Sequence, residues 1–104
     1  MYVAAGSTSV ELIDSANFKE FYLDANGRSL PEIADALENV NGGIILEGYA
    51  WIARPFLEAA LSANGGVWQA PFENMVAYAD SKGWVSRDAD LIFIRAHIVN
   101  AATN

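Results

Sequence analysis

The single histidine, His97, is the residue on which any imidazole chemistry of this chain would depend. A histidine can act as a general base or bind a metal ion, and Arg95 lies two residues before it. On a β-strand, His97 would share one face with Arg95 and Phe93. We favour the simpler interpretation, a partly solvated histidine on an exposed strand face. The G-x-S-x-G sequence of a serine nucleophile is absent, so we assign no catalytic residue and the sequence favours a protein that is not an enzyme.

Metal and cofactor chemistry has little support in the sequence. Asp88 and Asp90 could bind a hard cation through two carboxylates, but no third ligand accompanies them, and a solvated turn or a helix cap accounts for the same residues. The chain has no cysteine, which excludes disulfides, thiolate zinc sites and cysteine nucleophiles. It has no P-loop and no G-x-G-x-x-G sequence. We therefore expect no metal and no cofactor.

Acidic residues outnumber basic ones by thirteen to six, which gives a net charge of −7. Glu32, Asp35 and Glu38 recur at every third position of a predicted helix, away from Ile33 and Leu37. Such a surface can be ordinary solubilising charge, or it can steer association with a basic protein partner. The same net charge argues against a nucleic-acid partner, because phosphates need basic side chains, and against an anionic membrane surface.

Aromatic residues are a second candidate for binding, since the chain has three tryptophans among 104 residues. Some of these side chains belong to the core. The others are candidates for a binding surface, since tryptophan and tyrosine are over-represented at binding hot spots. The candidates are Tyr49, Trp51, Trp68 and Trp84. The apolar fraction of 53% also predicts a homo-oligomer that hides surplus apolar surface.

Three helices are predicted from local signals. Ser29 and Glu32 form a capping box, with Pro31 in the first turn. The three helices are expected at about residues 30–41, 55–63 and 71–82.

Strands are predicted at residues 10–13, 18–23, 43–52 and 91–99. In the last of them, Ile92, Ile94, Ala96 and Ile98 make an unbroken apolar face. A helix is the alternative for residues 91–99, where Leu91, Ile94 and Ile98 also make an apolar stripe, and for residues 18–23. Residues 43–52 are ambiguous too. As one strand they place Ile45, Glu47, Tyr49 and Trp51 on one face and Ile44, Leu46 and Ile52 on the other. The alternative is one long helix kinked at Pro55.

Together these elements predict a single α+β domain over residues 1–104, with a mostly antiparallel sheet and about three helices on one face. An all-α bundle is the alternative. The most apolar segment, residues 43–61, contains Glu47, Arg54 and Glu58, so it suits a core and not a membrane span. No signal-peptide pattern opens the chain, and we expect a soluble cytoplasmic protein.

Two functional hypotheses follow from these observations. The first is a small acidic domain that acts by binding another protein, as an inhibitor, an immunity or antitoxin-like factor, or an accessory subunit. The second is a small-molecule-binding domain or small enzyme with an aromatic-lined apolar pocket, in which His97 and Arg95 supply the polar anchor.

Overall fold

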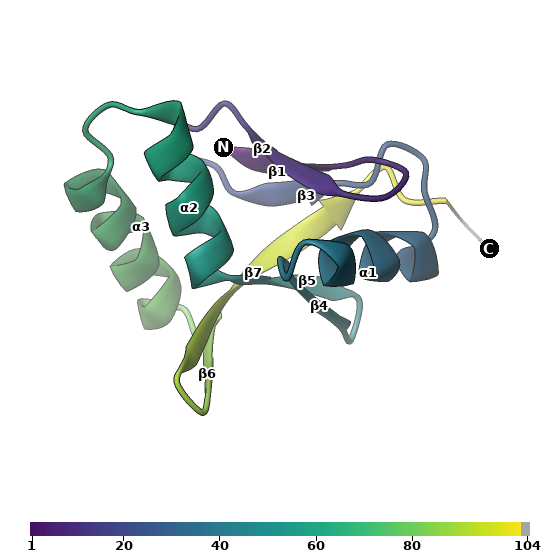
Figure 1. Ribbon diagram of the computed structural model, residues 1–104. Coiled ribbons are helices and arrows are strands. Elements are labelled where there is room, and N and C mark those ends of the chain that lie inside the picture. The colour runs from purple at the N-terminus through teal and green to yellow at the C-terminus, as the bar shows by residue number, and fades with distance from the viewer. Residues whose placement is uncertain (103–104) are drawn as a thin grey trace.

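The longest strand of the protein, β7 (Leu91–Val99), runs through the middle of a curled mixed sheet (Figure 1). The computed structural model describes residues 1–102, in which there are seven strands and three helices. The other elements follow along the chain as β1 (Tyr2–Ala5), β2 (Val10–Ile13), β3 (Tyr22–Asp24), α1 (Leu30–Asn39), β4 (Gly43–Leu46), β5 (Tyr49–Ala53), α2 (Arg54–Asn64), α3 (Gln69–Ser81) and β6 (Val85–Asp88).

The strands lie in the order β2-β1-β3-β7-β5-β4, with β2 and β4 at its two ends, and β6 lies off this order and pairs with β7. The pairs β1–β2, β4–β5, β5–β7 and β6–β7 are antiparallel, whereas β1–β3 and β3–β7 are parallel. Strands β3 and β6 share one side of β7, because β3 pairs with residues 97–99 and β6 with residues 91–94. The predicted α+β fold with a mostly antiparallel sheet is confirmed, and the all-α alternative is wrong.

One face of the sheet carries the hydrophobic core. Ile94 and Ala96 of β7 are buried there, as the alternation in its sequence predicts, and Ile52 of β5 lies beside Ile94. All three helices add apolar side chains to the same cluster, namely Ile33, Leu37, Leu57, Leu61, Phe72 and Val76. We call the opposite side of the sheet the open face; it includes Tyr49, Trp51, Arg95 and His97. No helix within residues 1–102 is both long and apolar enough to cross a membrane.

Residues 43–52 form a hairpin, not one strand, which corrects the predicted distribution of side chains. Glu47 and Gly48 both have positive φ, 54° and 82°, as a two-residue turn between antiparallel strands requires. The chain reverses there, so Ile44 and Leu46 lie on the same face as Tyr49 and Trp51. Ile44 and Leu46 therefore belong to the open face.

The other predicted boundaries are close to those observed, with three exceptions. Only Tyr22 and Leu23 of the predicted strand 18–23 lie in a strand, β3, and residues 14–21 form a loop instead. The Met1 ammonium nitrogen donates to the carbonyl oxygens of Asn17 and Glu20 and holds this loop against the start of the chain. Strands β1 and β6 are not expected from the sequence, because neither shows a strong alternation of apolar and polar residues.

Candidate functional site

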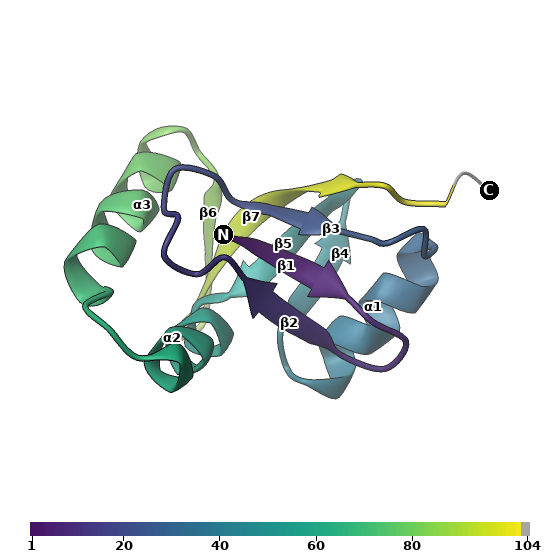
Figure 2. The ribbon, with the colours of Figure 1, turned by 90° about the horizontal axis from the view of Figure 1, so that it is seen from above.

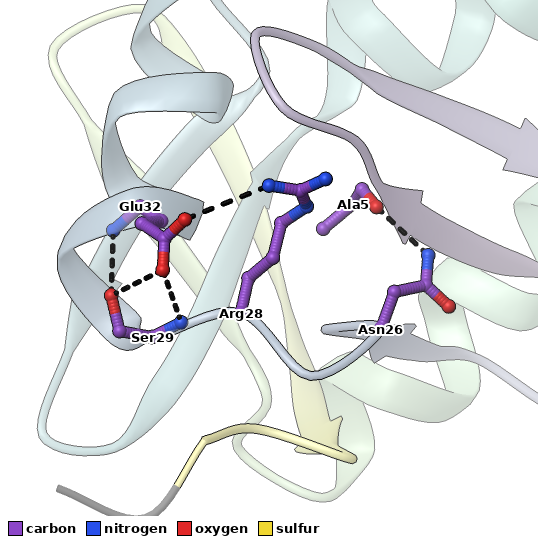
Figure 3. A network of polar contacts seen from close by, with 5 residues as sticks. All are labelled: Ala5, Asn26, Arg28, Ser29 and Glu32. Atoms are coloured by element: carbon purple, nitrogen blue, oxygen red, sulfur yellow. Dashed lines mark hydrogen bonds and ion pairs between the residues drawn. The ribbon is translucent and has the colours of Figure 1, made fainter.

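The first acidic candidate, Glu32, is engaged in the start of α1 (Figure 3). Its carboxylate accepts hydrogen bonds from the Ser29 N–H at 3.1 Å and the Ser29 hydroxyl at 3.0 Å, and it lies 3.6 Å from the Arg28 guanidinium. The Ser29 N–H first of all, then the hydroxyl and Arg28, hold the pKa of Glu32 below its ordinary value. The predicted capping box is confirmed. Because the Glu32 carboxylate is already hydrogen-bonded in this cap, it is less available to a partner than an unbonded carboxylate would be.

Asp35 and Glu38 lie further along α1 and are exposed. Their helix turns Ile33, Ala36 and Leu37 toward the core. Within residues 1–102, neither carboxylate has a basic side chain at ion-pairing distance. These two acids can therefore meet a basic group from outside the chain without breaking an internal ion pair.

Strand β4 brings an apolar edge next to these acids, because α1 packs against β4 (Figures 1 and 2). Ile44 and Leu46 are 50% and 53% exposed, and within the described residues no strand pairs with the outer side of β4. The hairpin closes on the pair Leu46 and Tyr49, so the alternate residues Gly43 and Ile45 direct their backbone N–H and C=O groups outward.

A groove of about 700 Å³ lies at one end of this edge. Glu38 of α1 lines it together with Ile44 of β4 and with Leu91 and Phe93 of β7. An acidic side chain and exposed apolar side chains thus border the same hollow. Leu91 and the two β4 residues were missed in the sequence, although an uncharged Gly-Ile-Ile-Leu run before a Glu-Gly turn is a usable sign of a hairpin edge.

Tyr49 and Trp51 stand on the open face, beside the polar pair Arg95 and His97. The Arg95 guanidinium carbon lies 4.2 Å from the centre of the Tyr49 ring, and the rings of Tyr49 and His97 are 5.6 Å apart. The side chain of His97 is exposed and makes no hydrogen bond within residues 1–102. The predicted sharing of one strand face by His97, Arg95 and Phe93 is confirmed.

Trp68 and Trp84 are half-buried and pack against the core, away from the β4 edge. Trp68 meets Phe72 edge-on at 5.9 Å, and Trp84 meets Tyr78 edge-on at 6.1 Å. Trp84 also lines a second cavity, between the 14–21 loop and α3, in which Arg95 takes part. His97 is not among the residues that line that cavity.

Asp88 and Asp90 flank Ala89 in the exposed turn between β6 and β7. In the part of the chain that the structure describes, no three histidine, cysteine, aspartate or glutamate residues gather closely enough to hold a metal ion. Comparison of the chain with protein-family models, with curated proteins and with solved structures found no significant match.

Proposed function

We propose that this chain binds another protein, and that the contacting segment of the partner is basic and extended. The observation that carries the proposal is the β4 edge, an uncharged strand with unpaired backbone groups and two exposed apolar side chains. Soluble proteins usually protect such an edge with a charge, a proline or a covering element. An edge left without these devices is the arrangement to which a partner strand can be added.

Charge supports a basic partner. Glu38 of α1 lines the groove beside β4, Asp35 is exposed on the same helix, and Glu47 follows β4 directly. Basic side chains that alternate along an added strand would meet these carboxylates, while its apolar side chains would cover Ile44 and Leu46. The cytoplasm remains the proposed compartment, because a chain without cysteine suits a reducing environment.

A second copy of this chain is a competing occupant of the same edge, as the expected homo-oligomer would require. Two copies would bring net charges of −7 together, and with Glu38 and Glu47 near β4 like charges would meet at the contact. We therefore assign the edge to a basic partner. Association of two copies is an outcome that the experiment below detects.

Photocrosslinking from the two edges of the sheet tests the proposal. p-Benzoylphenylalanine replaces Ile44 in β4, and the control carries it in place of Glu11 in β2. After irradiation in a lysate of the natural source, we expect an adduct from position 44 but not from position 11. Mass spectrometry should map the cross-linked segment of the partner to a stretch with net positive charge. Any one of four results would overturn the proposal. These are no adduct at position 44, equal adducts at both positions, a cross-linked segment without net positive charge, and an adduct to a second copy of this chain.

A further inference from the structure

The second cavity arises from the way in which two strands share one side of β7. Strand β3 pairs only with residues 97–99 and β6 only with residues 91–94, so the sheet divides at Arg95. There the Arg95 N–H donates to the Trp84 carbonyl oxygen at 2.8 Å. The 14–21 loop runs toward α3 (Figure 2). Residues of this loop and of α3 line a cavity of about 550 Å³. Sites for small organic molecules usually have volumes in this range.

The lining of this cavity is mainly aromatic and apolar. Phe18 and Phe21 come from the loop, Met75 and Tyr78 from α3, and Trp84 from the segment before β6. Such side chains bind the apolar body of a ligand, and flat aromatic rings also stack on its rings.

The charge of the lining differs from that of the whole protein. It contains Lys19 and Arg95, two of the six basic residues, but only Glu20 of the thirteen acidic residues. The residues that line the cavity therefore carry a net formal charge of +1, in a chain whose net charge is −7. This local excess favours an anionic ligand.

Arg95 differs from the other three arginines in its partners. Arg28, Arg54 and Arg87 each lie within 4.0 Å of a carboxylate oxygen. Within residues 1–102, Arg95 has no carboxylate at that distance, and its guanidinium contacts the rings of Tyr49 and Trp84 at 4.2 and 5.5 Å. Stacking on rings leaves the N–H donors at the edge of a guanidinium available, and these donors match the two oxygens of a carboxylate.

We propose that this cavity binds a small organic anion with an aromatic or aliphatic body, and that Arg95 recognises the anionic group. The aromatic lining holds the body of the ligand, and Lys19 adds positive charge at the loop side. The site does not depend on the β4 edge, so either proposal can fail without the other.

Two fluorescent dyes that share one ring system separate charge recognition from simple apolar binding. 8-Anilinonaphthalene-1-sulfonate carries an anionic group, whereas N-phenyl-1-naphthylamine has the same rings without it. We expect the native protein to bind the anionic dye more tightly, and Arg95→Gln to weaken that binding by about tenfold while the neutral dye changes less than about twofold. The matched control, Arg87→Gln, should leave the affinity for both dyes unchanged.

Further variants locate the dye and guard against misfolding. Met75→Trp fills the cavity and should weaken binding of both dyes, whereas a dye bound beside Tyr49 and His97, which do not line the cavity, would be unaffected. Arg95→Lys keeps the charge and should retain part of the affinity lost in Arg95→Gln. Each variant must show a cooperative thermal transition by circular dichroism, because partly unfolded chains bind both dyes. If Arg95→Gln fails this test, Arg95→Lys and Met75→Trp decide the result.

Decanoate and decan-1-ol extend the comparison to carboxylates. We expect decanoate to displace the anionic dye and decan-1-ol, with the same chain length and no charge, to compete far less. Any one of four results would overturn the proposal. These are equal affinity for the two dyes, equal effects of Arg95→Gln and Arg87→Gln on binding, dye binding that Met75→Trp does not change, and the absence of dye binding.

Discussion

Strands β2 and β4, at the two ends of the strand order, have the same length and each belongs to a hairpin, but they differ in charge and in exposed apolar side chains. Strand β2 carries Glu11 in its middle, and α2 lies near it, with Asn64 donating to the Ser15 hydroxyl at 3.2 Å. Strand β4 carries no charge, and its Ile44 and Leu46 are exposed. A helix lies near each of these strands, α2 near β2 and α1 near β4, so the difference lies in the charge of Glu11 and in the exposed Ile44 and Leu46. This contrast is the reason why we propose β4, and not β2, as the edge that accepts a partner.

The largest expected effect comes from the glycine that begins β4. Gly43 has φ of 149°, and a Cβ atom there would lie 2.1 Å from the Trp51 carbonyl oxygen. Gly43→Ala should therefore lower the free energy of unfolding by about 3 kcal/mol, because a backbone oxygen cannot move aside as a side chain can. The measurement is urea unfolding followed by circular dichroism.

The matched control for Gly43 is Gly6→Ala, next to the β2 hairpin. A Cβ atom at Gly6 would lie 3.2 Å from the Ser9 carbonyl oxygen, and Gly6 does not have positive φ. We expect this change to cost about 1 kcal/mol or less. Equal losses at the two glycines would show that the start of β4 is less constrained than its geometry indicates.

A positive charge on each edge tests the contrast in binding. For this test the photocrosslinker replaces Leu46, because position 44 is itself changed. Ile44→Lys should then lower the yield of cross-linked partner by about tenfold, since it removes apolar contact and repels a basic segment. Ile13→Lys makes the same change on the open face of β2 and should leave the yield unchanged. Similar losses in both variants would contradict a site restricted to β4.

The helices near the two strands, α1 near β4 and α2 near β2, differ in how their N-termini are capped. Ser29 caps α1 with its side chain, whereas Ala53, the N-cap residue of α2, provides no side-chain cap. Ser29→Ala should lower the free energy of unfolding by about 1 kcal/mol. Ser62→Ala, in the last turn of α2, serves as the control and should change it by less than about 0.5 kcal/mol. Thermal unfolding of both variants distinguishes the two cases.

Equal changes of charge at the two edges should have unequal effects on binding. Glu38→Lys places a positive charge in the groove beside β4 and should lower the cross-linking yield by about threefold, as for an exposed charge pair. Glu11→Lys changes the net charge by the same amount on β2 and should have no effect. If the two variants behave alike, net charge and not the β4 edge controls association. Glu32 is unsuitable for this test, because it holds the helix cap.

The smallest expected effect is the pH dependence that Glu32 confers. Its pKa is lower in the folded chain than in the unfolded chain, first because of the hydrogen bond from the Ser29 N–H. The contribution of Glu32 to stability is therefore complete above the unfolded-state pKa of 4.5 and decreases as the pH falls through the lower folded-state pKa. Glu32→Gln should make the melting temperature less sensitive to acid between about pH 5 and 3. Glu11→Gln is the control, at a side chain without a hydrogen bond within residues 1–102.

Much of the fold could be predicted where the signal lies within a few neighbouring residues. The capping box at Ser29 and Glu32 predicts the start of α1, and the alternation over residues 91–99 predicts β7 with its buried Ile94 and Ala96. The hairpin at Glu47 and Gly48 was missed, because a glutamate at positive φ is a weak turn signal beside the usual Asn-Gly or Asp-Gly. That single turn reversed the faces assigned to Ile44 and Leu46.

Some candidate functional residues could likewise be predicted from a local pattern, whereas others depend on contacts between distant segments. The acidic residues Asp35 and Glu38 could be chosen from the sequence, because helical periodicity alone places them away from the core. No local pattern could show that α1 lies beside β4, or that Arg95 has no carboxylate at ion-pairing distance within residues 1–102. Both depend on residues that are distant in the chain.

The sequence by itself determined the helix starts, the central strand, the acidic character and the fold class, because capping, periodicity and net charge are properties of short segments or of composition. The tertiary structure decided which strand became the unprotected edge, which acids lie beside it and where the cavity opens. The physical reason is that strand order and the division of the sheet at Arg95 come from pairing between distant segments, β3 and β6 with β7, and not from the residues of any one element.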